Sequence, residues 1–237
     1  MKTLIKGALF LSAALGVATV KAQSVDDIVN KHLDALGGKT VINAVRSVYV
    51  ESTVDLMGNE APSITYILNG KGYRNELDFN GSKIMQCVTD KGGWGINPLM
   101  GQTAATDIPG DQLKSSQLNL NLGGPLMDYT SKGFKVTFEG KDSADYKVKL
   151  TTKDGVEIVY YINNKTYFID KAVNRISING QDIETTAIFS DYKKTDVGLV
   201  MPYSQQIVLP QITLNITNKK IEVNKDIDPV IFEKPKS

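Results

Sequence analysis

The chain has 237 residues, of which 41% are hydrophobic and 22% charged, and its formal net charge is +1. Positive and negative charges therefore nearly cancel, which argues against a nucleic-acid partner, since binding nucleic acid requires a basic surface. A chain of this length buries a core without help from disulfides or metals. Its one cysteine, Cys87, excludes an intramolecular disulfide, and we expect that side chain to pack as a small hydrophobic group.

The first residues have the pattern of a secretory signal. Lys2 and Lys6 flank the start of the chain, an apolar run covers residues 8–20, and small side chains stand at Val20 and Ala22. This order of charge, apolar run and small residues is typical of a signal peptide that is cleaved after export. The apolar run is shorter than the roughly 20 residues that cross a bilayer as a helix.

We therefore expect residues 1–22 to be a signal peptide, cleaved near Ala22, and the mature protein to be exported from the cytoplasm. The alternative is an uncleaved membrane anchor. Cleavage removes three lysines and no acids, which changes the formal net charge from +1 to −2. We expect residues 23–237 to fold as a single domain, since the composition shows no linker within them.

One amphipathic helix is predicted at the start of the mature chain. Ser24 is a favourable N-cap with Asp27 at the third helical position, and apolar residues recur at helical spacing from Val25 to Leu36. Gly37 then ends the pattern. A second short helical turn is expected over residues 40–45.

From Ser47 onward the pattern changes to alternation, which predicts β-strands with one apolar and one polar face. It is cleanest at Ile212, Leu214 and Ile216. Short dipeptides that suit positive φ separate the strands and predict antiparallel hairpins. These dipeptides are Asn69-Gly70, Asn80-Gly81, Asp154-Gly155 and Asn179-Gly180.

The middle of the chain behaves differently. Residues 98–133 lose the alternation and contain Gly and Pro on both sides of residues 111–122. We expect one or two short helices here that cross the sheet, the first capped by Asp111. Strands are predicted to resume at Phe134.

No arrangement of residues indicates catalysis. His32 is the only histidine and has no partner at the spacing of a zinc site or a catalytic triad. The carboxylates Glu51, Asp55, Glu76 and Asp78 lie on predicted strands at positions where an alternating strand faces solvent. We therefore expect a protein that is not an enzyme and that uses no metal and no cofactor.

The predicted strands, about ten in number, offer more apolar surface than one good helix and a weak middle segment can cover. Two outcomes are open. The sheet curls into an incomplete barrel that encloses an apolar ligand under a helical plug, or it closes on its own side chains.

Several short motifs carry a resemblance to a known family. The stretches 70–74 (GKGYR) and 90–98 (DKGGWGINP) resemble a strand-hairpin-strand signature of the outer-membrane lipoprotein-sorting, LolA/LolB-like superfamily. The second half is similar to relatives common in Bacteroidetes-type bacteria, through residues 161–167, 189–193, 198–202 and 231–235.

This resemblance implies a mainly β (α+β) fold: an open antiparallel half-barrel with an N-terminal helix and short helices on its concave face. It also implies a periplasmic, non-enzymatic protein that shields lipid or lipoprotein acyl chains, as a carrier or a sensor. Candidate cavity or rim residues are then Tyr66, Leu68, Tyr73, Trp94 and Ile96, with Leu113, Leu118 and Leu122 as candidate lid residues.

The alternative for both sets of residues is an ordinary core. Asn69-Gly70-Lys71 stands where a lipoprotein carrier typically has Arg-Pro, so the chain departs from the family pattern at that point. The rival function is a protein-interaction module of the cell envelope, with a closed, dry sheet and no lipid ligand.

Overall fold

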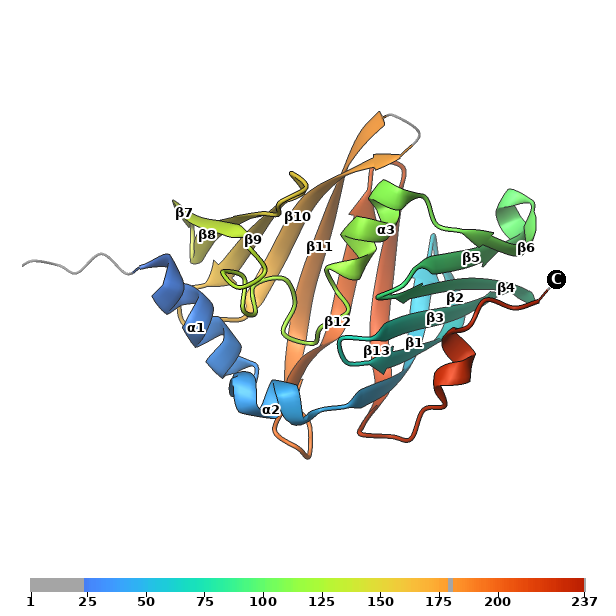
Figure 1. Cartoon of the computed structure of the whole chain (residues 1–237), viewed down its shortest axis with the longest axis horizontal. Coiled ribbons are helices and arrows are strands. Elements are labelled where there is room, and N and C mark those ends of the chain that lie inside the picture. Colours follow the sequence, from blue (N-terminus) through green and yellow to red (C-terminus); the bar gives the residue numbers. More distant parts are fainter. Residues whose placement is uncertain (1–23, 179–180, 237) are drawn as a thin grey trace, which may run out of the picture.

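The computed structural model describes residues 24–178 and 181–236. They form one antiparallel sheet of thirteen strands, in the order β6-β5-β4-β3-β2-β1-β13-β12-β11-β10-β9-β8-β7 (Figure 1). The two edge strands, β6 and β7, do not pair with each other, so the sheet stays open. The prediction of a mainly β, open antiparallel half-barrel is confirmed, and the predicted signal peptide lies outside the described residues.

The strands are joined mostly by short hairpins. Their bounds are β1 Ser47–Leu56, β2 Asn59–Leu68, β3 Gly72–Phe79, β4 Ser82–Thr89, β5 Gly93–Asn97, β6 Gln102–Asp107, β7 Lys135–Asp142, β8 Asp145–Thr151, β9 Glu157–Asn163, β10 Ile169–Ile178, β11 Gln181–Lys194, β12 Val200–Leu209 and β13 Ile212–Val223.

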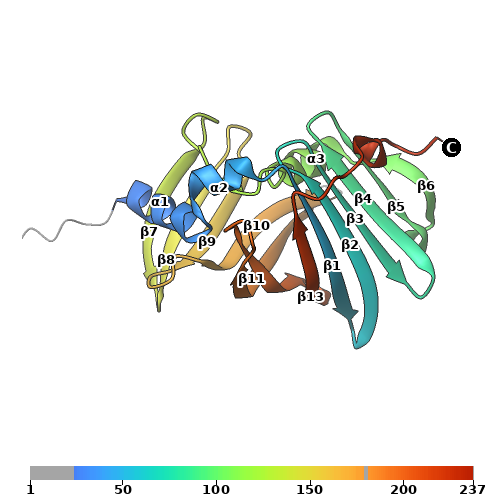
Figure 2. The same ribbon diagram turned by 90° about the horizontal axis from the view of Figure 1, so that it is seen from below.

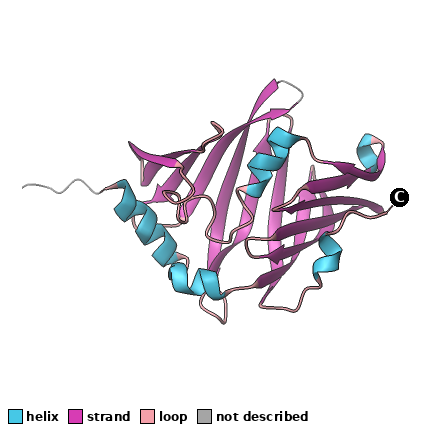
Figure 3. Cartoon of the chain, viewed as in Figure 1, coloured by secondary structure: helices cyan, strands magenta, loops and turns pink. Residues whose placement is uncertain are grey.

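The helical elements are few and short (Figure 3). They are α1 Val25–Ala35, α2 Gly38–Ala44, η1 Pro98–Met100, α3 Gly110–Gln117 and η2 Pro229–Phe232. The predicted capping of α1 is present: Ser24 Oγ accepts from the backbone N–H of Asp27, and the Asp27 carboxylate accepts from the backbone N–H of Ser24.

Two-residue turns set the pairing of the hairpins. At Asn80 and Gly81 φ is +53° and +82°, the pair of positive values that a type I′ turn needs. Asn69-Gly70 and Asp154-Gly155 also lie between paired strands, as predicted. Asn179-Gly180 lies outside the described residues. Met57-Gly58 forms a further turn, with φ of +55° and +83°, that its sequence does not predict.

The middle of the chain differs in part from expectation. Residues Gln102–Asp107 form the edge strand β6, although their polar sequence shows no apolar alternation. One helix follows, α3, and Pro109 occupies its N-cap position. Asp111 lies inside this helix, so the prediction that Asp111 caps it is wrong. Residues 118–134 pass over the sheet as turns without regular structure.

The sheet curves around α1, α2 and α3, which lie along the same side of it (Figure 2). We call that side the concave face. Alternation along the strands assigns each side chain to a face. Val48 pairs with Ile67 and Ile67 with Tyr73, and these three lie on the concave face; their neighbours Tyr66 and Arg74 lie on the other, convex face.

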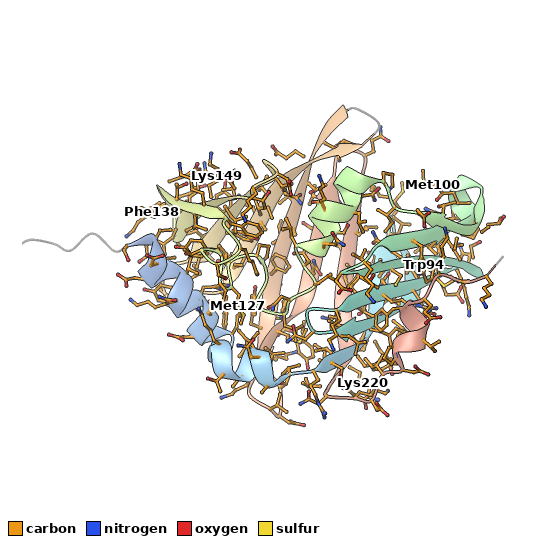
Figure 4. The ribbon with its side chains drawn as sticks, viewed as in Figure 1. Trp94, Met100, Met127, Phe138, Lys149 and Lys220 are labelled. Atoms are coloured by element: carbon orange, nitrogen blue, oxygen red, sulfur yellow. The ribbon has the colours of Figure 1, made fainter. Side chains whose placement is uncertain are left out.

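Buried apolar residues gather in two clusters. The larger lies on the concave face between α1, α2, the segment 118–134 and strands β7 to β9, with Leu33, Met127 and Leu150 at its centre. The smaller contains Cys87, Trp94, Ile227 and Phe232, which places it on the convex face under the C-terminal segment 224–236. Figure 4 shows Met127 beside α1 and Trp94 in the opposite half of the sheet.

Candidate functional site

Helix α3 spans the opening of the curved sheet. It contacts β4 on one side and β10 on the other, although six strands separate β4 from β10 in the sheet. A Cβ atom on Gly93 would lie 2.9 Å from Leu113 Cδ1 of α3, so the missing side chain lets the helix sit close to β5. The concave surfaces of the intervening strands form a floor that α3 crosses.

This floor carries no charge. In β1 to β5, β12 and β13, every concave position holds an uncharged residue, as the strand alternation assigns them. The charged residues of the same strands lie on the convex face or at the β-bulge where β1 pairs with β13. Among them are Glu51, Asp55, Glu60, Arg74, Glu76, Asp78, Lys83, Lys220 and Glu222. This separation of charged and uncharged residues between the two faces suits a floor that contacts an apolar ligand or apolar side chains.

Nine aliphatic and phenylalanine side chains of the floor are only half-buried and belong to neither packed cluster. Because helices α1 and α2 pack over the other end of the molecule, these side chains keep part of their surface exposed. We call this set the apolar floor; it consists of Leu56, Leu77, Phe79, Ile84, Ile207, Leu209, Ile212, Leu214 and Ile216.

A small polar network borders the apolar floor. Asn75 Nδ2 donates to Ser63 Oγ and to Thr65 Oγ1, both at 2.9 Å. On the neighbouring strand, Ser52 Oγ donates to Asn218 Oδ1 at 2.8 Å. All five residues occupy concave positions, so hydrogen-bonding groups without charge lie between the helix-covered core and the apolar floor.

A separate pocket of about 860 Å³ lies at the end of the sheet where β2 turns into β3. Its walls come from α2 and the start of β1, the two turns at residues 69–71 and 89–91, and the C-terminal segment. The lining residues are Asn43, Val45, Arg46, Leu68, Asn69, Lys71, Gly72, Thr89, Asp90, Lys91, Asn121, Pro229, Phe232 and Glu233.

Asn69 fixes the shape of this pocket. Its Nδ2 donates to the carbonyl oxygens of Ile42 and Val45, and its Oδ1 accepts from the backbone N–H of Leu122. The turn that contains Asn69 is thereby joined both to α2 and to the segment that passes over the sheet. The charged lining includes both signs, with Arg46, Lys71 and Lys91 against Asp90 and Glu233, so the pocket has no strong preference for an anion.

The sequence-predicted cavity residues do not share one face. Tyr73 lies on the concave face, next to the polar network, and burial raises its pKa. Tyr66, Leu68, Trp94 and Ile96 lie on the convex face, where they pack in the smaller cluster. Leu68 also lines the pocket. The ligand contacts expected of these five residues stay a prediction.

Trp94 is covered by the C-terminal segment. Its Nε1 donates to the carbonyl oxygen of Phe232 at 3.1 Å, the Cys87 thiol donates to the same oxygen, and Arg74 donates to the carbonyl of Ile231. A Cβ atom on Gly72 would meet the Phe232 ring at 2.9 Å, so this glycine makes room for the ring. Sequence reasoning missed this contact because it joins segments about 140 residues apart.

The candidate lid residues are divided between two places. Leu113 lies on α3 above Gly93, over the floor. Leu118 and Leu122 pack against the larger cluster, together with Leu126 and Met127 from the same segment, which are almost completely buried. Their role as a lid for a ligand stays a prediction.

Groups with catalytic potential are either buried or dispersed. His32 is buried; burial lowers its pKa, partly opposed by the hydrogen bond that its Nδ1 donates to the carbonyl of Tyr167. Burial raises the pKa of the Cys87 thiol to about 11, which leaves it protonated. Within the described ranges, no three His, Cys, Asp or Glu side chains gather in a way that fits a metal ion.

No protein-family model matches the sequence, and no curated protein matches it either. Solved structures do match its fold. A DUF1329 family protein from Desulfovibrio piger ATCC 29098 has a TM-score of 0.59 at 13% identity, covering 90% of this chain and 98% of its own. LolA superfamily protein NE2245 from Nitrosomonas europaea has a TM-score of 0.59 at 12% identity, covering 90% and 99%.

A third similar structure is described as an outer membrane lipoprotein-sorting protein domain from Vibrio parahaemolyticus, with a TM-score of 0.54 at 13% identity, covering 87% of this chain and 96% of its own. The relationship to Bacteroidetes-type proteins stays a prediction. Among the described residues, no helix has the length and apolar character to cross a membrane. The chain therefore shares the fold of these three solved structures, one of which is described as a LolA superfamily protein.

Proposed function

We propose that the protein is a non-enzymatic binding protein of the periplasm that shields lipid or lipoprotein acyl chains on its concave face, as a carrier or a sensor. The observation that carries this proposal is the uncharged floor of β1 to β5, β12 and β13, in which nine aliphatic and phenylalanine side chains remain half-buried. Contact with an acyl chain would bury them further, with a gain of roughly 0.8 kcal/mol for each CH₂ group of the ligand that leaves water.

Helix α3 supports the proposal because it lies over this floor and touches strands on both sides of it. Its contacts with the packed core are few: Leu113 is half-buried, and no residue of α3 belongs to a packed cluster. A helix held this loosely can move to admit a chain. Periplasmic location rests on the signal pattern of residues 1–22 and on the likeness to an outer membrane lipoprotein-sorting domain.

The rival function is a protein-interaction module of the cell envelope. That proposal depended on a closed, dry sheet, whereas β6 and β7 leave the sheet open. The exposed Leu99 and Met100 beside β6, 55% and 77% accessible, are the feature that favours a protein partner. The two functions differ in what a purified sample carries.

Native mass spectrometry of protein exported to the periplasm, with extraction and analysis of bound lipid, tests the proposal. We expect an acyl-bearing species at close to one per chain, removed by delipidation and restored by adding lipid. Protein that is free of lipid as purified, and that stays free after lipid is added, would refute the carrier or sensor function and favour the interaction module.

A further inference from the structure

The polar network beside the apolar floor has hydrogen-bonding capacity left over. Asn75 uses both N–H groups of its amide within the network, since its Nδ2 donates to Ser63 and to Thr65. Its Oδ1 makes no hydrogen bond within the described part of the chain. This oxygen is also not fully buried. The Asn75 carbonyl is thus an acceptor that a ligand on the concave face can reach.

The same network also offers donors. Ser63 Oγ accepts from Asn75, which leaves the hydroxyl hydrogen of Ser63 unused. Tyr73 lies beside Thr65, and burial raises the pKa of Tyr73, so its phenol keeps a proton to donate. One acceptor and two donors, all uncharged, therefore lie side by side on β2 and β3, where Thr65 pairs with Asn75 and Ile67 with Tyr73.

The apolar floor begins directly next to this network. Leu77 and Phe79 are the next concave residues after Asn75 along β3, and Leu77 pairs with Ile84 on β4. A linear ligand with its polar group at Asn75 would place its hydrocarbon chain along Leu77 and Phe79, toward the hairpin tips. The network fixes where the polar group of such a ligand ends and the apolar chain begins.

Chemistry then discriminates between the common linkages of an acyl chain. A secondary amide has one N–H to donate and one carbonyl to accept, which matches the acceptor and the donors of the network. An ester has no hydrogen-bond donor. The Asn75 carbonyl would therefore lose its hydrogen bond to water on ligand binding and gain none in its place. A carboxylate adds a charge to a floor that holds no cation at any concave position of β1 to β5, β12 and β13.

From these observations we infer that the Ser63, Thr65, Tyr73 and Asn75 network recognises the amide linkage of an N-acylated ligand. This inference rests on the proposed function, because it assumes that the hydrocarbon chain lies on the apolar floor. It names the ligand more closely than the fold does: an acyl chain joined through a neutral secondary amide, in preference to an ester or a free fatty acid.

Displacement of a bound fluorescent alkyl probe tests the inference with three ligands that share one chain: N-methylpalmitamide, methyl palmitate and palmitate. We expect the amide to displace the probe at about tenfold lower concentration than the ester, the effect of one hydrogen bond that is lost on desolvation. Palmitate is expected to be weaker again at pH 8. Equal displacement by amide and ester would overturn the inference while leaving lipid binding itself intact.

Asn75→Leu is expected to bind the probe and to lose the preference for the amide. The control is Asn215→Leu, on the exposed convex side of β13, which should keep the preference. Because Asn75→Leu breaks the bonds to Ser63 and Thr65, Tyr73→Phe serves as a second variant; it removes one hydroxyl and should reduce the preference by a few fold. Full preference in both variants would overturn the inference, and failure of the wild-type protein to bind the alkyl probe at all would instead refute the proposed function.

Discussion

The two ends of the concave face show the same alternation of apolar residues, but the apolar side chains are buried at one end and partly exposed at the other. Beneath α1 and the segment 118–134, Val148, Leu150 and Ile162 are completely buried. On the central strands, Leu214 and Ile216 alternate just as regularly but remain half-buried outside any cluster. An apolar strand face therefore shows where the protein excludes charge, and the position of the helices decides whether the chain itself fills that face.

Replacing a side chain at the covered end should have the largest effect on stability. Leu150→Ala removes a side chain that is 0% exposed, and we expect a loss of about 3 kcal/mol in the free energy of unfolding, because a cavity remains. Urea unfolding followed by circular dichroism measures it. Ile216→Ala on the central floor is the comparison, with an expected loss of about 1 kcal/mol for a half-buried side chain. Equal losses would contradict the difference between the two ends.

The convex cluster extends the comparison to the other side of the sheet. Phe232→Ala removes a ring that is 7% exposed and packs over Gly72, so we expect a loss of about 3 kcal/mol and a red shift in the fluorescence of Trp94. Val230→Ala, at a side chain 55% exposed in the same turn, is the matched control. Unchanged stability and fluorescence in Phe232→Ala would mean that the C-terminal segment does not cover Trp94 in solution.

The thiol of Cys87 reports on the same cover. With a pKa of about 11, the buried thiol has about a hundredfold less thiolate at pH 8 than an ordinary cysteine. We expect slow reaction with a disulfide reagent in the wild-type protein and a faster reaction in Phe232→Ala, where the segment is loosened. A fast reaction in the folded wild-type protein would show that the convex cluster opens readily.

The smallest expected effect concerns His32, beneath the covered end. Burial lowers its pKa, so the folded protein holds a neutral ring while the unfolded chain takes up a proton below about pH 6.5. The stability due to the neutral ring is therefore complete above that pH and decreases as the pH falls, by at most about 1.4 kcal/mol per pH unit. Urea unfolding at pH 8, 6 and 5, compared with His32→Gln, measures it; a pH-independent difference between the two proteins would contradict a buried neutral His32.

Much of the fold was predictable because its signals are local. The capping pair Ser24 and Asp27 and the turn at Asn80-Gly81 each act within a few residues. Strand β6 was not, because a polar edge strand such as Gln102–Asp107 forms through pairing with β5 rather than through its own apolar pattern.

The candidate site was less predictable than the fold. The alternation of apolar residues indicates that Tyr66, Leu68 and Trp94 lie on an apolar face of the sheet. It does not indicate that the C-terminal segment covers that face. The contacts of Phe232 with Trp94, Cys87 and Gly72, which are far from it in the sequence, distinguish the convex cluster from the concave floor. The signal for the floor was present in another form, as the lack of charge at alternate residues of β1 to β5 and β12, and of β13 as far as its bulge after Asn218.

A pair of adjacent substitutions tests the central claim most directly. Ile216→Glu places a charge on the apolar floor, whereas Thr217→Glu places the same charge one residue away on the exposed convex face. Titration of both delipidated variants with a fluorescent alkyl probe should show at least a tenfold loss of affinity for Ile216→Glu and wild-type affinity for Thr217→Glu, provided that circular dichroism shows both to be folded. Wild-type affinity in folded Ile216→Glu would show that ligands do not bind on the concave floor.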